Sequence, residues 1–170
     1  MQPHNTTDFS TDSGVPLHTD APLNNRQGTT CNLGVHHDWS GSTSGKITFR
    51  VIEGKFAPQG IQDLSKMHLY CKIKLGWHTK KTAVANMEGD SANWGGEAIS
   101  LKVIDQEQAK LKIKDKAGHL IDKTLGHAHI HLKDIILVRK LTKWVPIIKK
   151  DQLVGEVHLE MKFHPQTPGM

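Results

Sequence analysis

The stretch KMHLYCKIKLGWHTKKT, residues 66–82, alternates apolar residues with cationic or aromatic ones. Cys71, Ile73 and Leu75 occupy every second position, and polar side chains stand between them. Successive side chains of a β-strand point to opposite faces, so this pattern is typical of a strand with one buried face and one cationic face. The stretch therefore predicts a sheet whose outer surface is rich in lysine.

Alternation with a period of two continues along the chain after residue 45. The runs that show it best are KITFRVI (46–52), YCKIKLG (70–76), EAISLKVI (97–104), AKLKIKDK (109–116), GHAHIHL (126–132), residues 144–148 and EVHLEMKF (156–163). Glycine and proline turn signals separate the runs, and residues 132–141 are expected to form at most a brief helix. Seven or eight short strands of this kind predict an all-β fold, an eight-stranded antiparallel β-sandwich.

The chain divides into a polar arm and a basic domain. Residues 1–45 are rich in Asn, Thr, Ser, Gly, Pro and His, and one Arg against four Asp gives them a net charge of −3. The whole-chain charge of +5 then leaves +8 for the remainder. We predict that the arm is extended and disordered unless a partner binds it, because it buries too little apolar surface to fold alone. The β-sandwich is expected over residues 46–164, followed by a short tail at 165–170.

The compartment is expected to be reducing and cytoplasmic. The first residues lack the basic start and apolar core of a secretory signal. No apolar run approaches the roughly 20 residues that a membrane span needs. Only two cysteines are present, Cys31 and Cys71, which argues against a disulfide framework. These features are compatible with a cytoskeletal or organelle-associated assembly and with a peripheral membrane protein.

The order of these runs resembles a C2 domain over residues 46–164. The resemblance rests on the succession of strands together with Trp94, the Leu125-Gly126 pair, Trp144 and the closing Gly-Glu strand. It implies a Greek-key sandwich, and the segment MHLYCKIKLG is most similar to a family member that binds phosphoinositides without calcium. The resemblance also implies buried or half-buried positions for the tryptophans Trp77, Trp94 and Trp144.

The family's calcium loops have lost acidic residues in this sequence. C2 domains that bind calcium use about five aspartates on three loops at one end, since the ion takes roughly six to eight oxygen ligands. The resemblance places degenerate calcium-loop positions at Asp63, His68, Asp115, Ala117 and Asp122. Each missing carboxylate removes a ligand and the charge that attracts the ion. We therefore predict a calcium-independent domain that uses no metal or other cofactor.

Two interpretations of the lysine alternation stay open. In one, a basic sheet face holds anionic lipid headgroups, since a cation near an anionic membrane contributes about 1 kcal/mol. In the other, the lysines form a solvated face that favours solubility and discourages edge pairing. Lysines of residues 109–116 extend the same surface. The candidate lipid-binding residues are Lys72, Lys74, Lys80, Lys81 and Lys112.

Three outward histidines, His127, His129 and His131, suggest a metal site, because alternate residues of a strand share a face and imidazoles bind zinc. Successive side chains on that face are about 6.6 to 7 Å apart, so all three reach one ion only with strain. We favour solvent-facing or interface histidines over a metal site.

Motifs of enzymes and of nucleic-acid binding are absent from the sequence. It has no phosphate-binding glycine-rich loop before a helix, no nucleophile elbow and no cysteine pairs with zinc spacing. We expect no catalysis and no small-molecule substrate. The sequence pI is about 9.2, but aromatic residues make up only 5% and form no stacking platform, so no nucleic-acid partner is expected.

Two functions of different classes remain. In the first, the chain is a structural or adaptor subunit of a larger intracellular assembly, and its arm docks on a protein partner through Trp39 beside His36 and His37. In the second, it is a peripheral membrane module that binds phosphoinositide or other anionic lipid without calcium. The sequence favours the first, because the loops show no clear exposed apolar pair for insertion into a bilayer.

Overall fold

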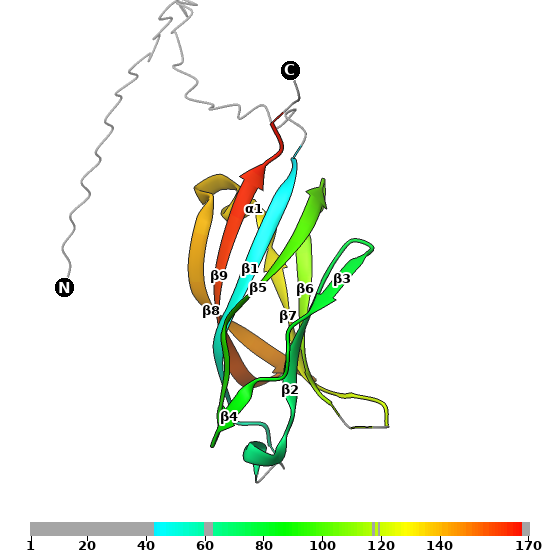
Figure 1. The fold of residues 1–170 in the computed structure, drawn as a ribbon, viewed down its shortest axis with the longest axis vertical. Coiled ribbons are helices and arrows are strands. Elements are labelled where there is room, and N and C mark those ends of the chain that lie inside the picture. The colour runs from blue at the N-terminus through cyan, green and yellow to red at the C-terminus, as the bar shows by residue number, and fades with distance from the viewer. Residues whose placement is uncertain (1–42, 60–62, 117, 119, 168–170) are drawn as a thin grey trace, which may run out of the picture. The chain divides into compact units, whose positions relative to one another are not determined.

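Nine β-strands, one α-helix and one 3-10 helix form the part of the chain that this computed structural model describes, residues 43–59, 63–116, 118 and 120–167 (Figure 1). The strands are β1 (Ser44–Phe56), β2 (Leu69–Leu75), β3 (His78–Lys81), β4 (Asn86–Glu88), β5 (Ser91–Ile104), β6 (Gln108–Asp115), β7 (Lys123–His131), β8 (Lys140–Lys149) and β9 (Gln152–Pro165). The helices are η1 (Leu64–Lys66) and α1 (Leu132–Val138). The predicted all-β class is confirmed, with one strand more than the eight expected, since the three residues of β4 are too few to show an alternation.

The strands pair in the order β3-β2-β6-β7-β8-β9-β1-β5-β4, and every pair is antiparallel. A single residue pair, His127 with Ile148, joins β7 to β8. The curled sheet therefore behaves as two layers, a four-stranded sheet β3-β2-β6-β7 and a five-stranded sheet β8-β9-β1-β5-β4. In Figure 1, β9, β1 and β5 run side by side with β6 and β7 behind them, as expected for a sandwich.

The core lies between the two sheets and is built from alternate strand positions. The inward positions predicted from the sequence are buried, among them Ile47, Phe49 and Val51 of β1, Cys71 and Ile73 of β2, Leu111 and Ile113 of β6, and Ala128 and Ile130 of β7. Burial of one large apolar side chain contributes about 1.5–3 kcal/mol. A slip of one residue would turn all these side chains toward water, so the core holds each strand in register.

The β2–β3 hairpin projects from the four-stranded sheet and is tied down at its base. Leu75 pairs with His78 across a two-residue turn, in which Gly76 takes a positive φ of 55°. The buried Thr82 follows β3, and its Oγ1 accepts a hydrogen bond from Cys71 N at 3.0 Å. All four side chains of β3 are exposed, so the hairpin reaches beyond the core.

Helix α1 is the brief helix expected among residues 132–141. It packs onto the end of the sandwich through Leu132 and Ile135, which are buried. It ends at Val138, and the C-cap residue Arg139 has a φ of 67°. Neither helix in the described ranges has the length and apolar character needed to cross a bilayer.

The two ends of the sandwich domain lie together. β1 begins at Ser44, and the backbone N–H of Gln166 donates to the carbonyl of Ser44 at 3.0 Å. Strand β9 continues to Pro165, slightly beyond the predicted end of the domain. The predicted arm falls almost entirely on residues 1–42, outside the described residues, so its expected disorder stays a prediction.

Candidate anion-binding face

Strands β2 and β6 set lysines directly opposite one another on the outer surface of the four-stranded sheet. Lys72 pairs with Lys112, and Lys74 pairs with Lys110. Their neighbours in the chain point inward and are buried, so all four ammonium groups leave the sheet on one side. Side chains of directly opposed residues start about 5 Å apart, which brings four positive charges close together.

Strand β3 extends this surface by one lysine and one hydroxyl. Lys81 lies opposite Lys72, and Thr79 lies opposite Lys74, so both share the outer face. Lys80 lies opposite Ile73 and therefore points to the other side of the sheet. The structure thus separates Lys80 from the other predicted lipid-binding lysines and places Lys110 on the same face as them, opposite Lys74.

Strand β7 completes the surface with two histidines. His127 lies opposite Lys112, and His129 lies opposite Lys110. Two rows of outward side chains consequently cross the sheet, one from Lys81 to His127 and one from Thr79 to His129. We refer to the side chains Lys72, Lys74, Lys81, Lys110, Lys112, His127 and His129 as the basic face.

A hollow lies at the centre of the basic face. It has a volume of about 330 Å³ and is lined by Lys72, Lys74, Thr79, Lys110 and Lys112. Four of these five residues are lysines, whose ammonium groups are hydrogen-bond donors, and the fifth carries a hydroxyl. A hollow of about 470 Å³ near the β5–β6 loop has a mixed lining that includes acidic side chains. A hollow of about 480 Å³ on the five-stranded sheet has no acid in its lining but only two lysines, Lys46 and Lys102. The hollow of the basic face, with four lysines, is therefore the one that best suits the oxygen atoms of a phosphate group.

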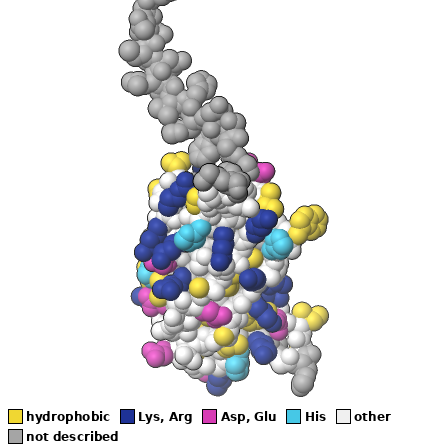
Figure 2. Space-filling view, turned by 45° about the horizontal axis from the view of Figure 1, so that its top comes forward, with side chains coloured by type: hydrophobic (Ala, Val, Ile, Leu, Met, Phe, Trp, Pro, Cys, Tyr) yellow, Lys and Arg dark blue, Asp and Glu magenta, His cyan; other side chains and the backbone are white. Residues whose placement is uncertain are grey.

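Counter-charges are missing from the basic face, as far as the described ranges of the chain extend. None of its five lysines lies within 4.0 Å of a carboxylate, and the only acid in its four strands is Asp115. On the five-stranded sheet, Glu160 binds Lys140 Nζ at 3.0 Å and Lys162 Nζ at 3.2 Å. These two lysines lower the pKa of Glu160. The surface shown in Figure 2 likewise has acidic side chains among its basic ones.

The histidines of the basic face lie beside each other and beside lysines. The rings of His127 and His129 meet edge to face, with centroids 5.7 Å apart. Partial burial lowers the pKa of His129, and the nearby Lys110, His127 and His131 lower it further. Among the described residues, no three His, Cys, Asp or Glu side chains converge as metal ligands would.

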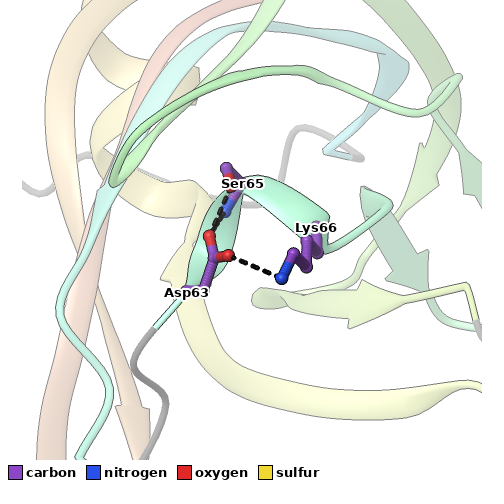
Figure 3. Close-up of polar contacts among 3 residues, drawn as sticks. All are labelled: Asp63, Ser65 and Lys66. Atoms are coloured by element: carbon purple, nitrogen blue, oxygen red, sulfur yellow. Dashed lines mark hydrogen bonds and ion pairs between the residues drawn. The ribbon is translucent and has the colours of Figure 1, made fainter.

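The acids at the calcium-loop end are engaged within the protein. Asp63 accepts hydrogen bonds from the backbone N–H of Ser65, at 3.1 Å, and from its hydroxyl, and lies 3.3 Å from Lys66 Nζ (Figure 3). Ser65 first, and then Lys66, lower the pKa of the Asp63 carboxyl. Asp63 thereby caps the short helix η1.

Two further acids tie the β6–β7 segment to the start of β2. Asp115 Oδ1 accepts a hydrogen bond from the backbone N–H of His68 at 2.8 Å, and Lys116 N donates to the His68 carbonyl at 3.0 Å. Asp122 Oδ2 accepts from the hydroxyl of Tyr70 at 2.6 Å. The remaining degenerate calcium-loop position, Ala117, lies outside the described residues. These carboxylates hold loop to strand instead of converging on one point.

Two expectations about apolar residues are corrected. Trp77 was expected to be buried or half-buried, but its side chain is 96% exposed because it sits at the hairpin turn. Trp94 and Trp144, at 7% and 37% exposure, match the expectation. The loops also carry an exposed apolar pair after all, since Leu120 and Ile121 project from the β6–β7 loop. The candidate partner-binding residues Trp39, His36 and His37 lie outside the described residues.

Titration of Tyr70 tests the engagement of Asp122. Tyr70 is the single tyrosine of the chain, so phenolate absorbance follows one group. Burial first, and then the hydrogen bond to Asp122, raise the pKa of Tyr70 to about 12. The unfolded value is about 10, so this stabilisation is complete below about pH 10 and is lost as pH rises through the folded pKa. We expect Asp122→Asn to lower the pKa part of the way toward the unfolded value, and Asp90→Asn to leave it unchanged. A wild-type midpoint at the unfolded value would contradict the assignment.

Comparison with known proteins places this sandwich in a family. No curated protein sequence matches the chain. A solved C2 domain-containing protein superposes with a TM-score of 0.66 at 22% identity, over 75% of this chain and 94% of that chain. A C2 domain of plant extended synaptotagmin 1 gives 0.60 at 18% identity, over 75% and 98% of the two chains. Human GIVD cytosolic phospholipase A2 gives 0.57 at 18% identity, over 74% of this chain and 18% of that chain. The C2 domain family model matches residues 45–147, more than half of the sequence, and the chain therefore belongs to the C2 domain family.

Proposed function

We propose that this C2 domain binds anionic membrane lipid without calcium, with a phosphorylated headgroup seated on the basic face. The observation that carries the proposal is the set of lysines that share one sheet face, none of which lies within 4.0 Å of a carboxylate of the described residues. Four of them surround one hollow of about 330 Å³. The proposed ligand supplies negative charge to lysines that form no ion pair with a described carboxylate of the protein.

The energetics of the face support an anionic ligand. Like charges directly opposed on neighbouring strands destabilise a sheet. The face contains three such contacts, Lys72 with Lys112, Lys74 with Lys110 and Lys72 with Lys81. A phosphate group on the face removes this repulsion and accepts charge-assisted hydrogen bonds, which are about twice as strong as neutral ones. We therefore expect the face with a bound anion to be more stable than the face in contact with water alone.

The alternative of a merely solvated face explains the arrangement less well. Soluble surfaces generally intersperse both signs of charge, as Glu160 does between Lys140 and Lys162 on the other sheet. The adaptor function depends on Trp39, His36 and His37, which the structure does not describe, and it stays a prediction. The lipid-binding function is the one that described residues support.

Independence from calcium is part of the proposal. Calcium takes roughly six to eight oxygen ligands, whereas Asp63, Asp115 and Asp122 each bind a donor within the protein. Lys66 adds a positive charge beside Asp63. We therefore assign membrane attraction to the lysines of the sheet and not to a bridging ion.

Charge reversal on the basic face tests the proposal. We expect Lys72→Glu with Lys74→Glu to lower binding to phosphoinositide vesicles by about thirtyfold or more, since two lysines near an anionic surface contribute about 2 kcal/mol. Lys46→Glu with Lys102→Glu is the matched control, because these lysines also oppose each other but lie on the five-stranded sheet. Co-flotation with vesicles in a calcium chelator measures both. Equal losses in the two variants, or binding only when calcium is added, would contradict the proposal.

The histidines predict a pH dependence with a defined sign. Burial and the neighbouring cations lower the pKa of His129, so a bound anion should raise it and proton uptake should accompany binding. Affinity is then expected to increase as pH falls through the range in which His129 takes up its proton. His127→Gln with His129→Gln should remove that increase, while His158→Gln on the other sheet should keep it. The ratio of variant to wild-type affinity is the measurement, because titration of the lipid cancels in it. A ratio that does not change with pH would exclude a role for these histidines.

A further inference from the structure

Trp77 is the most exposed large hydrophobic side chain among the described residues. It is 96% exposed and occupies the second position of the two-residue turn between β2 and β3. Figure 2 shows groups of hydrophobic side chains that stand out from one side of the molecule. A tryptophan placed this way has almost none of its ring covered by the protein.

The turn itself does not call for tryptophan. Two-residue hairpin turns with a glycine first, as Gly76 is here with φ of 55°, depend on that glycine for their backbone geometry. The second position takes small or polar residues without loss. Burial of apolar surface contributes about 25 cal/mol per Å² to stability, and an exposed tryptophan ring contributes none of this. Nothing in the local fold therefore accounts for a tryptophan at this position. We take its exposure to indicate that the ring contacts a surface outside the protein.

The position of the turn identifies that surface. Trp77 follows Lys74 by three residues and precedes Thr79 by two, and both of these line the hollow of the basic face. At about 3.3 Å per residue, the ring starts within roughly 10 Å of that hollow. The hairpin contains several cations and no acid, although exposed Asp105 and Glu107 lie in the loop whose Gln106 packs beside Gly76. When a lipid headgroup occupies the hollow, the interface of the bilayer therefore lies close to the β2–β3 turn.

We propose that Trp77 is a membrane anchor, which inserts its ring at the boundary between headgroups and acyl chains when the basic face holds anionic lipid. This inference rests on the proposed function. Tryptophan is the residue that membrane interfaces favour, because its ring is apolar and its N–H finds a hydrogen-bond partner among the headgroups. The lysines supply attraction and the ring supplies contact with the apolar layer, so the β2–β3 hairpin determines which end of the domain penetrates the membrane.

The test compares a vesicle with a soluble headgroup on the full chain. Phosphatidylcholine vesicles that contain phosphatidylinositol bisphosphate are titrated in parallel with soluble inositol trisphosphate. We expect Trp77→Ala to lower vesicle affinity about tenfold and to leave inositol trisphosphate affinity unchanged. Trp144→Ala, which removes the half-exposed tryptophan of the five-stranded sheet, should leave vesicle affinity unchanged. Lipids brominated near the headgroup should quench wild-type fluorescence more than that of Trp77→Phe.

The outcomes separate the anchor from the basic face. Equal vesicle affinity for wild type and Trp77→Ala overturns the anchor and leaves the lipid-binding function standing. Loss of vesicle affinity in Leu120→Ser with Ile121→Ser, but not in Trp77→Ala, overturns it by assigning insertion to the opposite end of the sheet. Wild-type binding of inositol trisphosphate without vesicle binding shows a soluble ligand and overturns the anchor. Failure of wild type to bind either probe overturns the proposed function and the anchor together.

Discussion

The antiparallel pairing of β2 with β6 is the constraint on which the outer surface of the four-stranded sheet depends. It sets Lys72 against Lys112 and Lys74 against Lys110, an arrangement that a sheet tolerates only at some cost in stability. The pairing cannot slip to relieve the repulsion, because Cys71, Ile73, Leu111 and Ile113 are buried on the opposite side of the same strands. The hydrophobic core thus imposes the cluster of charge, and the charge in turn defines what the face attracts.

The acidic side chains have different partners in different parts of the sandwich. At the calcium-loop end, Asp63, Asp115 and Asp122 bind donors of the protein, so that acids work as internal ties. On the five-stranded sheet, Glu160 forms ion pairs with two lysines. The basic face gathers five lysines, and among the described residues none of the five lies within 4.0 Å of a carboxylate. The proposed specificity for an anion rests on this contrast, which the total charge of the chain would not produce.

Sequence patterns predicted the fold class and the direction of most side chains, because alternation reports burial directly. They place the lysines of residues 109–116 on the same surface as those of β2 but do not give the register between the strands, and the structure adds that Lys110 lies opposite Lys74. Lys80 was assigned to the wrong side, since every residue of β3 is exposed and its alternation carries no burial signal. The exposure of Trp77 was missed for a related reason. The resemblance to the C2 family suggests which tryptophan positions are buried. The two-residue turn that exposes Trp77 is a local feature of this chain.

Side-chain nuclear magnetic resonance of the lysines during titration with soluble inositol trisphosphate tests the central claim most directly. Each lysine reports its own environment, so the method distinguishes a defined site from diffuse attraction to a basic protein. The account predicts large shifts at Lys72, Lys74, Lys110 and Lys112 that saturate together, with little change at Lys46 and Lys102. Shifts of similar size at all lysines, or none at these four, would contradict it.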